Sequence, residues 1–248
     1  MSIVQSLRGA AVFALGAVML PATTALAATR DSVDGPRPVR VSAEDVEASN
    51  KKVAMAYSAL TEMWSKAFYY IGDQFAAPHI VRYNRGARTA CGMIGPNNAM
   101  YCPTNNTVYY DQVFVAAMQK ITGDATGTDG DMAGVGIIAH EVGHAVAMQL
   151  GHASRDSYKN ESVADCLTGA FAHQAGKDGS LEKGDVEEAE HAMAMVGDPS
   201  PESTGNARYD RLVQRQLARN SHGTKEQRMQ NFRTGLEGGA GACLREFR

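Results

Sequence analysis

The chain has 248 residues, of which 44% are hydrophobic, and it carries a formal charge of -3 at pH 7. A chain of this length can bury one sizeable core, or two lobes that share a cleft, and nothing in its organisation indicates a string of domains. This charge balance excludes the strongly basic footprint typical of nucleic-acid-binding domains, so we expect no nucleic-acid partner.

The segment 1–27 has the order of parts typical of a secretory signal peptide. One cation, Arg8, precedes an uncharged run over 9–20, and the small-residue triplet ALA ends the segment. This run is shorter than the roughly 20 apolar residues of a membrane span, so cleavage is favoured over a retained anchor. We therefore expect an exported protein, periplasmic or extracellular.

Residues 28–41 combine charges, glycine and prolines without apolar periodicity, which indicates a flexible lead-in to a domain over 42–248. Ser42 and Asp45 form the pattern of a capping box at the start of a helix. Apolar residues then recur at spacings of three and four as far as Ile71, which predicts a long amphipathic helix.

Between 78 and 111 the sequence changes to short β-branched and aromatic runs separated by turn residues. HIVRY, AMYCP and TVYYD predict strands, the last two forming a hairpin around an Asn-rich turn. Residues 99–101 could form an edge strand along which an extended peptide lies. Asp111 is expected to cap the next helix, and the tyrosines are expected to pack the strands.

After Asp111 the pattern is helical. We predict helices near 112–121, 131–150, 159–175, 185–196, 207–219 and 225–236. Asp185 with Glu188, and Thr224 with Gln227, have the spacing of capping boxes. Gly151 and Gly197 are expected to end helices.

The segment IIAHEVGHAV carries His140, Glu141 and His144 within an apolar helical pattern. Residues four apart lie on one helix face, so both imidazoles can bind one metal ion. Glu141 lies beside them and can act as general base on a water at the metal. Catalytic zinc typically has a third protein ligand. Glu161, in the segment NESVADC, is the candidate, and Asp165, one helical turn later, can support a ligating histidine.

The pattern H-E-x-x-H followed by N-E-x-x-x-D resembles the gluzincin metallopeptidases typified by thermolysin. The chain is more closely similar to the bacterial neutral zinc metallopeptidase family over most of 90–243. Matching stretches are MYCPTNNTVYYD, IIAHEVGHAV, ESVADCLTGAFA, GDVEEAEHAMAMVGD and SHGTKEQRMQNFRTG. The resemblance implies a zincin-like α+β fold, mostly helical, with a small twisted sheet over an active-site helix, a second ligand-bearing helix, and one zinc ion per chain.

This chain departs from the family pattern at a few positions. The family often has histidine and glutamine where this chain has Ala145 and Ala147, and ELQADC where it has ESVADC. These departures bear on substrate preference, because none falls on a proposed ligand or base. The resemblance also makes His222 a candidate to stabilise the oxyanion, against a plain surface or capping role, whereas Arg228 is expected mainly to form a salt bridge.

Export would expose the four cysteines to oxidation. Three pairings are possible, and we favour Cys91–Cys102, which are close in sequence, together with Cys166–Cys243. A cysteine metal site is disfavoured because the chain has no C-x-x-C pair.

These features favour the hypothesis of an exported zinc metallopeptidase that acts on a peptide or protein. Two alternatives stay open: a non-catalytic, zinc-stabilised envelope binding or scaffold protein, and a hydrolase of cell-wall peptide cross-links. A further contact with an anionic envelope surface could use a stripe of arginines, although a solvated helix face explains the stripe more simply. The stripe consists of Arg208, Arg211, Arg215 and Arg219. No feature predicts an oligomeric state.

Overall fold

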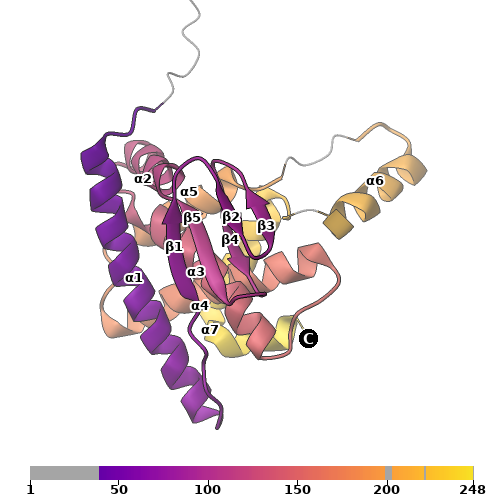
Figure 1. Ribbon diagram of the computed structural model, residues 1–248. Coiled ribbons are helices and arrows are strands. Elements are labelled where there is room, and N and C mark those ends of the chain that lie inside the picture. The colour runs from indigo at the N-terminus through magenta and orange to yellow at the C-terminus, as the bar shows by residue number, and fades with distance from the viewer. Residues whose placement is uncertain (1–38, 199–202, 221, 248) are drawn as a thin grey trace, which may run out of the picture. The chain divides into compact units, whose positions relative to one another are not determined.

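The computed structural model describes residues 39–198, 203–220 and 222–247, all within the unit Pro38–Arg248. The predicted signal peptide and most of the predicted lead-in lie outside these residues. In chain order, the elements are α1 (Ala43–Tyr70), β1 (His79–Tyr83), β2 (Ala87–Thr89), β3 (Gly92–Ile94), β4 (Ala99–Cys102), β5 (Thr107–Asp111), α2 (Gln112–Thr126), α3 (Asp131–Gln149), α4 (Ser157–Asp178), α5 (Asp185–Met195), α6 (Ala207–Asn220) and α7 (Lys225–Glu246). The mostly helical α+β class is confirmed (Figure 1).

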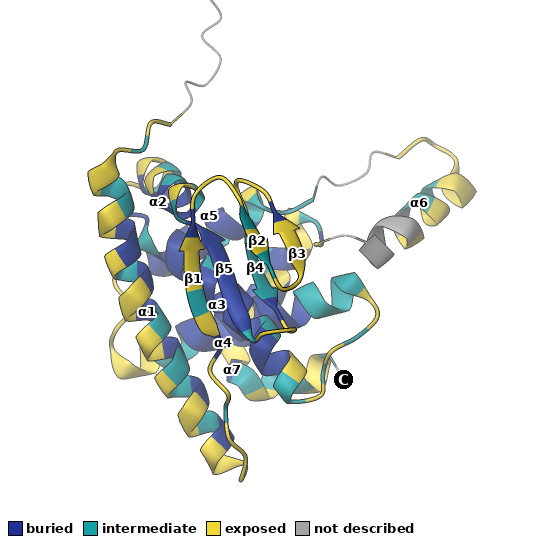
Figure 2. Ribbon diagram, in the orientation of Figure 1, coloured by how far each residue is buried: buried dark blue, intermediate teal, exposed yellow. Residues whose placement is uncertain are grey.

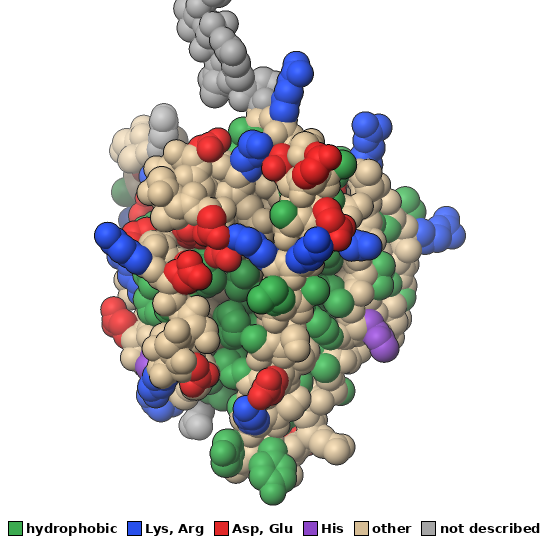
Figure 3. Space-filling model, turned by 90° about the vertical axis from the view of Figure 1, so that its left-hand side faces the viewer, with side chains coloured by type: hydrophobic (Ala, Val, Ile, Leu, Met, Phe, Trp, Pro, Cys, Tyr) green, Lys and Arg blue, Asp and Glu red, His purple; other side chains and the backbone are tan. Residues whose placement is uncertain are grey.

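Helix α1 begins as the sequence predicts. The Ser42 hydroxyl accepts from the amide of Asp45, whose carboxylate accepts from the amide of Ser42, so the capping box is confirmed. Its buried stripe includes Leu60, Trp64 and Phe68, and it packs on α2 and α3. The outer surface on the side where α1 lies carries charges of both signs, interspersed with apolar side chains (Figure 3). Within the described residues, no helix is long and apolar enough to cross a bilayer.

The main sheet has the strand order β1-β5-β4. β5 pairs antiparallel with β4, as the predicted hairpin requires, and parallel with β1. Every residue of β5 is buried because it is the central strand and lies over α3 (Figure 2). A second hairpin, β2-β3, occupies the Gly-, Asn- and Pro-rich stretch in which we predicted no strand. β4 is left as an edge strand of the main sheet.

The helices after β5 fall close to their predicted ranges, and α2, α4 and α7 run longer. Asp111 caps α2 and Thr224 caps α7 through a capping box, as predicted. Gly151 follows the end of α3 with a left-handed φ of 74°. Gly197 also follows the end of its helix, but without a left-handed φ; a β-carbon there would lie 2.5 Å from the amide nitrogen of Lys225.

The predicted capping box of Asp185 and Glu188 is wrong. Gly184, at φ 109°, precedes α5 without a side-chain cap, and the Asp185 carboxylate instead accepts from the amide of Glu182. Glu188 turns away from its own helix because the first amides of α3 lie within its reach. It accepts from Gly130 at 3.1 Å and from Met132 at 2.9 Å.

Both favoured disulfides, Cys91–Cys102 and Cys166–Cys243, are present. The second links α4 to α7, which pack backbone against backbone. A β-carbon on Gly235 would lie only 1.8 Å from the carbonyl oxygen of Cys166, so the two helices can approach this closely only with glycine there. This packing fixes α7 beside the segment that carries Glu161 and Asp165.

Candidate metal centre

Helix α3 places His140, Glu141 and His144 in the middle of the fold. The helix is apolar nearly all round, and it contacts α1, α2, α4, α5 and the sheet. The two imidazoles project one turn apart, with their Nε2 atoms 3.1 Å from each other. His140 is buried and His144 is half-buried, so their ring nitrogens lie in a water-poor environment in which polar atoms need a partner.

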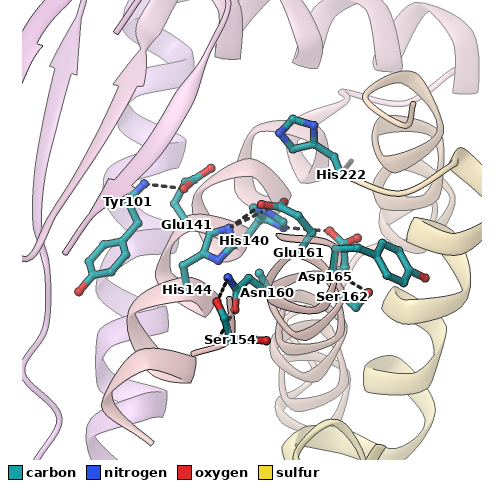
Figure 4. Close-up of polar contacts among 12 residues, drawn as sticks. Tyr101, His140, Glu141, His144, Ser154, Asn160, Glu161, Ser162, Asp165 and His222 are labelled. Atoms are coloured by element: carbon teal, nitrogen blue, oxygen red, sulfur yellow. Dashed lines mark hydrogen bonds and ion pairs between the residues drawn. The ribbon is translucent and has the colours of Figure 1, made fainter. Parts of the chain in front are cut away.

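Helix α4 brings Glu161 to the same point. Its Oε2 lies 3.0 Å from Nε2 of His140, and its Oε1 lies 3.6 Å from Nε2 of His144. Gly143 allows the two helices this proximity, because a β-carbon there would already lie 3.1 Å from the carbonyl oxygen of Ala164. Figure 4 shows the two rings and the carboxylate pointing toward one another.

The loop between the two helices is fixed locally. Asp156 caps α4 by accepting from the amide of Lys159. Asn160 accepts from the amide of Ser154 at 2.8 Å and donates to the Ser154 carbonyl oxygen at 2.9 Å. These bonds hold the first turn of α4, and with it Glu161, against the end of α3.

The three groups fit a zinc ion. Tetrahedral ligands at zinc–nitrogen distances of about 2.0–2.1 Å lie about 3.3 Å apart. Nε2 of His140 lies 3.0 Å from Oε2 of Glu161 and 3.1 Å from Nε2 of His144, which in turn lies 3.6 Å from the other carboxylate oxygen, Oε1. With the Nδ1 proton of His140 assigned to Asp165, its Nε2 lone pair faces two other acceptor atoms, an arrangement that a cation stabilises. The described residues thus form a group that could hold a metal ion.

Asp165 lies behind His140, as the sequence predicts for a supporting carboxylate. Its Oδ1 is 2.9 Å from Nδ1 of His140. Arg228, on α7, donates from Nε to Oδ2 at 3.1 Å and from Nη2 to Oδ1 at 2.7 Å. Asp165 is fully buried and Arg228 is 6% exposed, so this is a buried, bidentate ion pair. The expected salt-bridge role of Arg228 is confirmed.

The electrostatics of the site favour added positive charge. Burial lowers the pKa of His140, but hydrogen bonds to Asp165 and Glu161 outweigh it and raise that pKa. Burial raises the pKa of Glu161, and the His140 hydrogen bond then outweighs it and lowers that pKa. Burial and the neighbouring charge of His140 both lower the pKa of His144, which keeps its imidazole neutral. Neutral imidazole and ionised carboxylate are the forms that bind metal, so a bound ion would take the place of the second proton of His140.

The side chain of Glu141 points away from the ligand atoms of His140, His144 and Glu161 and toward β4. Its Oε2 accepts from the amide of Tyr101 at 2.6 Å, and burial raises its pKa. It lines two adjoining cavities, of about 190 Å³ and about 380 Å³. The first extends along apolar side chains that include Phe114, Ile137 and Met193, and the second along Tyr101 and Met148. Glu141 therefore stands where the two cavities meet.

His222 lies on the rim of both cavities. Its amide donates to Oδ2 of Asp198 at 2.8 Å, and its side chain is 64% exposed, with Nδ1 3.7 Å from Oδ1 of Asp198. The ring is thus accessible from the side of the metal group (Figure 4). Among the predicted basic stripe, Arg208, Arg211 and Arg215 are exposed on α6, and the Arg219 side chain lies outside the described part.

Comparison with known proteins agrees with this geometry. The profile of the family described as "Putative neutral zinc metallopeptidase" matches residues 10–247. The chain belongs to this family. Relatives include Uncharacterized protein YpfJ of Escherichia coli K12, 34% identical over 228 residues that span 82% of this chain and 72% of that protein. Uncharacterized protein Rv2575 of Mycobacterium tuberculosis is 28% identical over 194 residues, spanning 66% of this chain and 60% of that protein. No solved structure matches the chain.

Proposed function

We propose that this member of the family is an exported zinc-dependent peptidase that hydrolyses peptide bonds in the cleft formed by the two cavities. The observation that carries the proposal is the convergence of the ligand atoms of His140, His144 and Glu161, with Glu141 beside them at the junction of the cavities. A scaffold protein could use the three ligands alone. It would have no need for a buried carboxylate that opens onto a cleft, so Glu141 favours the enzyme.

His140, His144 and Glu161 would hold one zinc ion per chain, which when bound supplies a Lewis acid and makes water more acidic. Glu141 would take the proton of the attacking water and then pass it to the leaving amine. Its raised pKa suits this role, since a buried carboxylate is a stronger base than an exposed one. Asp165, fixed by Arg228, would keep the Nδ1 proton of His140 in place so that Nε2 stays a ligand atom.

His222 is proposed to donate a hydrogen bond to the oxyanion that forms at the scissile carbonyl. Its exposed ring on the rim of both cavities supports this role. For the export of the protein, support comes from the sequence of 1–27 and from the two disulfides, which are typical of proteins in oxidising compartments.

The test compares purified wild type (residues 28–248) with Glu141→Gln on a mixed peptide library, with zinc content measured for both. We expect equal zinc and about 1,000-fold slower cleavage in the variant, because the amide cannot accept the proton. Glu187→Gln, an exposed glutamate on α5, is the matched control. Equal cleavage by wild type and Glu141→Gln would remove Glu141 from the mechanism. Release of peptides from isolated sacculi would favour the cell-wall substrate over other peptides.

A further inference from the structure

The backbone of β4 presents alternate residues to its free edge. The amide of Asp111 donates to the Asn98 carbonyl oxygen at 2.9 Å, and the register pairs Met100 with Tyr109. Because hydrogen-bonded and non-hydrogen-bonded pairs alternate in an antiparallel ladder, Asn98 and Met100 bond to β5. Ala99 and Tyr101 therefore direct their amide and carbonyl groups away from β5, toward the cleft.

The outward amide of Tyr101 is already used. It donates to Oε2 of Glu141 at 2.6 Å, a short bond to a buried carboxylate (Figure 4). Among the described residues, Oε1 of Glu141 has no protein partner. One oxygen of the base is thus fixed, and the other is left for solvent beside the metal ligands.

The side chain of Tyr101 holds this part of the strand in place. Its hydroxyl donates to Oδ1 of Asn106 at 3.0 Å, and Nδ2 of Asn106 donates to the carbonyl oxygen of Ala76 at 3.0 Å. The strand is thereby tied both to its own hairpin turn and to the segment before β1. An amide in a strand anchored in this way can hold a carboxylate in one orientation.

We propose that the main-chain amide of Tyr101 is the positioning group for Glu141, and that Ala99 is thereby left as the one residue of β4 whose amide can donate to a bound peptide. The proposal rests on the proposed peptidase function. A peptide added along β4 would find an amide and a carbonyl at Ala99. At Tyr101 it would find a carbonyl but no available amide, and the next outward position, Pro103, has no N–H. The edge strand therefore serves the base at one residue and the substrate at another.

Proline substitution separates these two roles, because an edge strand tolerates proline where the amide points away from its neighbour. Tyr101→Pro removes the donor to Glu141 and should lower kcat about 10- to 100-fold, the size expected for losing a hydrogen bond to a charged group, with KM changed less than about twofold. Ala99→Pro removes the donor to the peptide and should instead raise KM. Tyr101→Ala keeps the amide and measures the part of any effect that comes from the ring.

A second readout does not depend on turnover. Hydrogen exchange of the Tyr101 amide should be at least about tenfold faster in Glu141→Ala than in wild type, while exchange at Met100, bonded to β5, stays the same. Zinc content and melting temperature establish that each variant is folded; if Tyr101→Pro does not fold, an amide-to-ester replacement at Tyr101 takes its place.

Equal kcat losses in Tyr101→Pro and Tyr101→Ala, unchanged kcat in Tyr101→Pro, or unchanged exchange of the Tyr101 amide would each overturn the inference. A wild type that holds zinc but cleaves no peptide would instead refute the proposed function, and the positioning role with it, even if the exchange data show the bond.

Discussion

Two groups of potential metal ligands lie along helix α3, and they differ in how their ligand atoms are paired. At its amino-terminal end, Asp129, Asp131 and Glu188 lie close enough to share an ion. Lys52, however, approaches Asp129 at 2.5 Å and Asp131 at 3.3 Å. Glu188 accepts from two backbone amides, which also places its negative charge at the positive end of the helix.

At the middle of α3, the second group has no lysine or backbone-amide donors of this kind. Two imidazole nitrogens and the Glu161 carboxylate face one another, and the cation nearest to them, Arg228, is bound to Asp165. The comparison teaches that proximity of ligand atoms does not mark a metal centre. Lone pairs that converge with no lysine or backbone amide to pair them are the better sign, because burying such a group is unfavourable until a proton or a metal ion binds there.

Removing the Arg228 guanidinium, which pairs with Asp165 behind His140, should have the largest effect on stability. Arg228→Leu leaves the carboxylate of Asp165 buried without its ion-pair partner, so we expect the free energy of unfolding to fall by about 3–5 kcal/mol. Urea denaturation of zinc-free protein measures this. The control is Arg233→Leu on the same helix, because Arg233 pairs with Glu190 at the surface and its loss should change stability by less than about 1 kcal/mol. Similar losses in both variants would show that the buried pair has no special role.

A substitution in the amino-terminal group of Asp129, Asp131 and Glu188 should lower stability and leave zinc binding unchanged. Glu188→Ala leaves two amides of α3 without acceptors, and we expect a loss of about 2–4 kcal/mol with unchanged zinc content. Glu187→Ala, an exposed neighbour on α5, should change stability by less than about 0.5 kcal/mol. Loss of zinc from a folded Glu188→Ala protein would break the distinction between the two groups.

The sequence predicts well what is encoded locally. The spacing of His140 and His144, the capping boxes at Ser42 and Thr224, and the hairpin of β4 and β5 all depend on residues near one another in the chain. The partners of Glu188 and Arg228 lie 58 and 63 residues away, so no local pattern indicates them. The spacing of Asp185 and Glu188 even predicts the wrong partner, because the amides of a second helix compete for the same carboxylate.

Two other features are not predicted from the sequence, one local and one long-range. The short strands β2 and β3 form in a turn-rich stretch that has little strand propensity. The contact of Glu141 with Tyr101 joins residues 40 apart and uses a backbone amide, which no side-chain motif can reveal. Glu161, by contrast, can be predicted as a ligand because it stands in a recognisable motif, N-E-x-x-x-D.

The hydrogen-bonded hydroxyl of Tyr83 offers the test with the smallest expected effect on stability. The Tyr83 hydroxyl shares its one proton between the carbonyl oxygens of Gly95 and Asn98, both at 2.9 Å, and burial together with the charges of Asp111 and Glu141 raises its pKa to about 12. Its contribution to stability should therefore be complete below pH 10, the usual tyrosine pKa, and be lost as the pH rises toward 12. Tyr83→Phe should lower stability by about 1 kcal/mol and remove the last phenol to ionise in an ultraviolet titration. Titration of all tyrosines near pH 10 would contradict this pairing.

Zinc content measured by elemental analysis tests the central claim most directly. Wild type and Glu188→Gln should each bind about one zinc per chain, whereas Glu161→Ala and His144→Ala should retain little after dialysis, although the protein remains folded. A full zinc complement in folded Glu161→Ala, or zinc lost from Glu188→Gln instead, would show that the metal lies elsewhere and contradict the account.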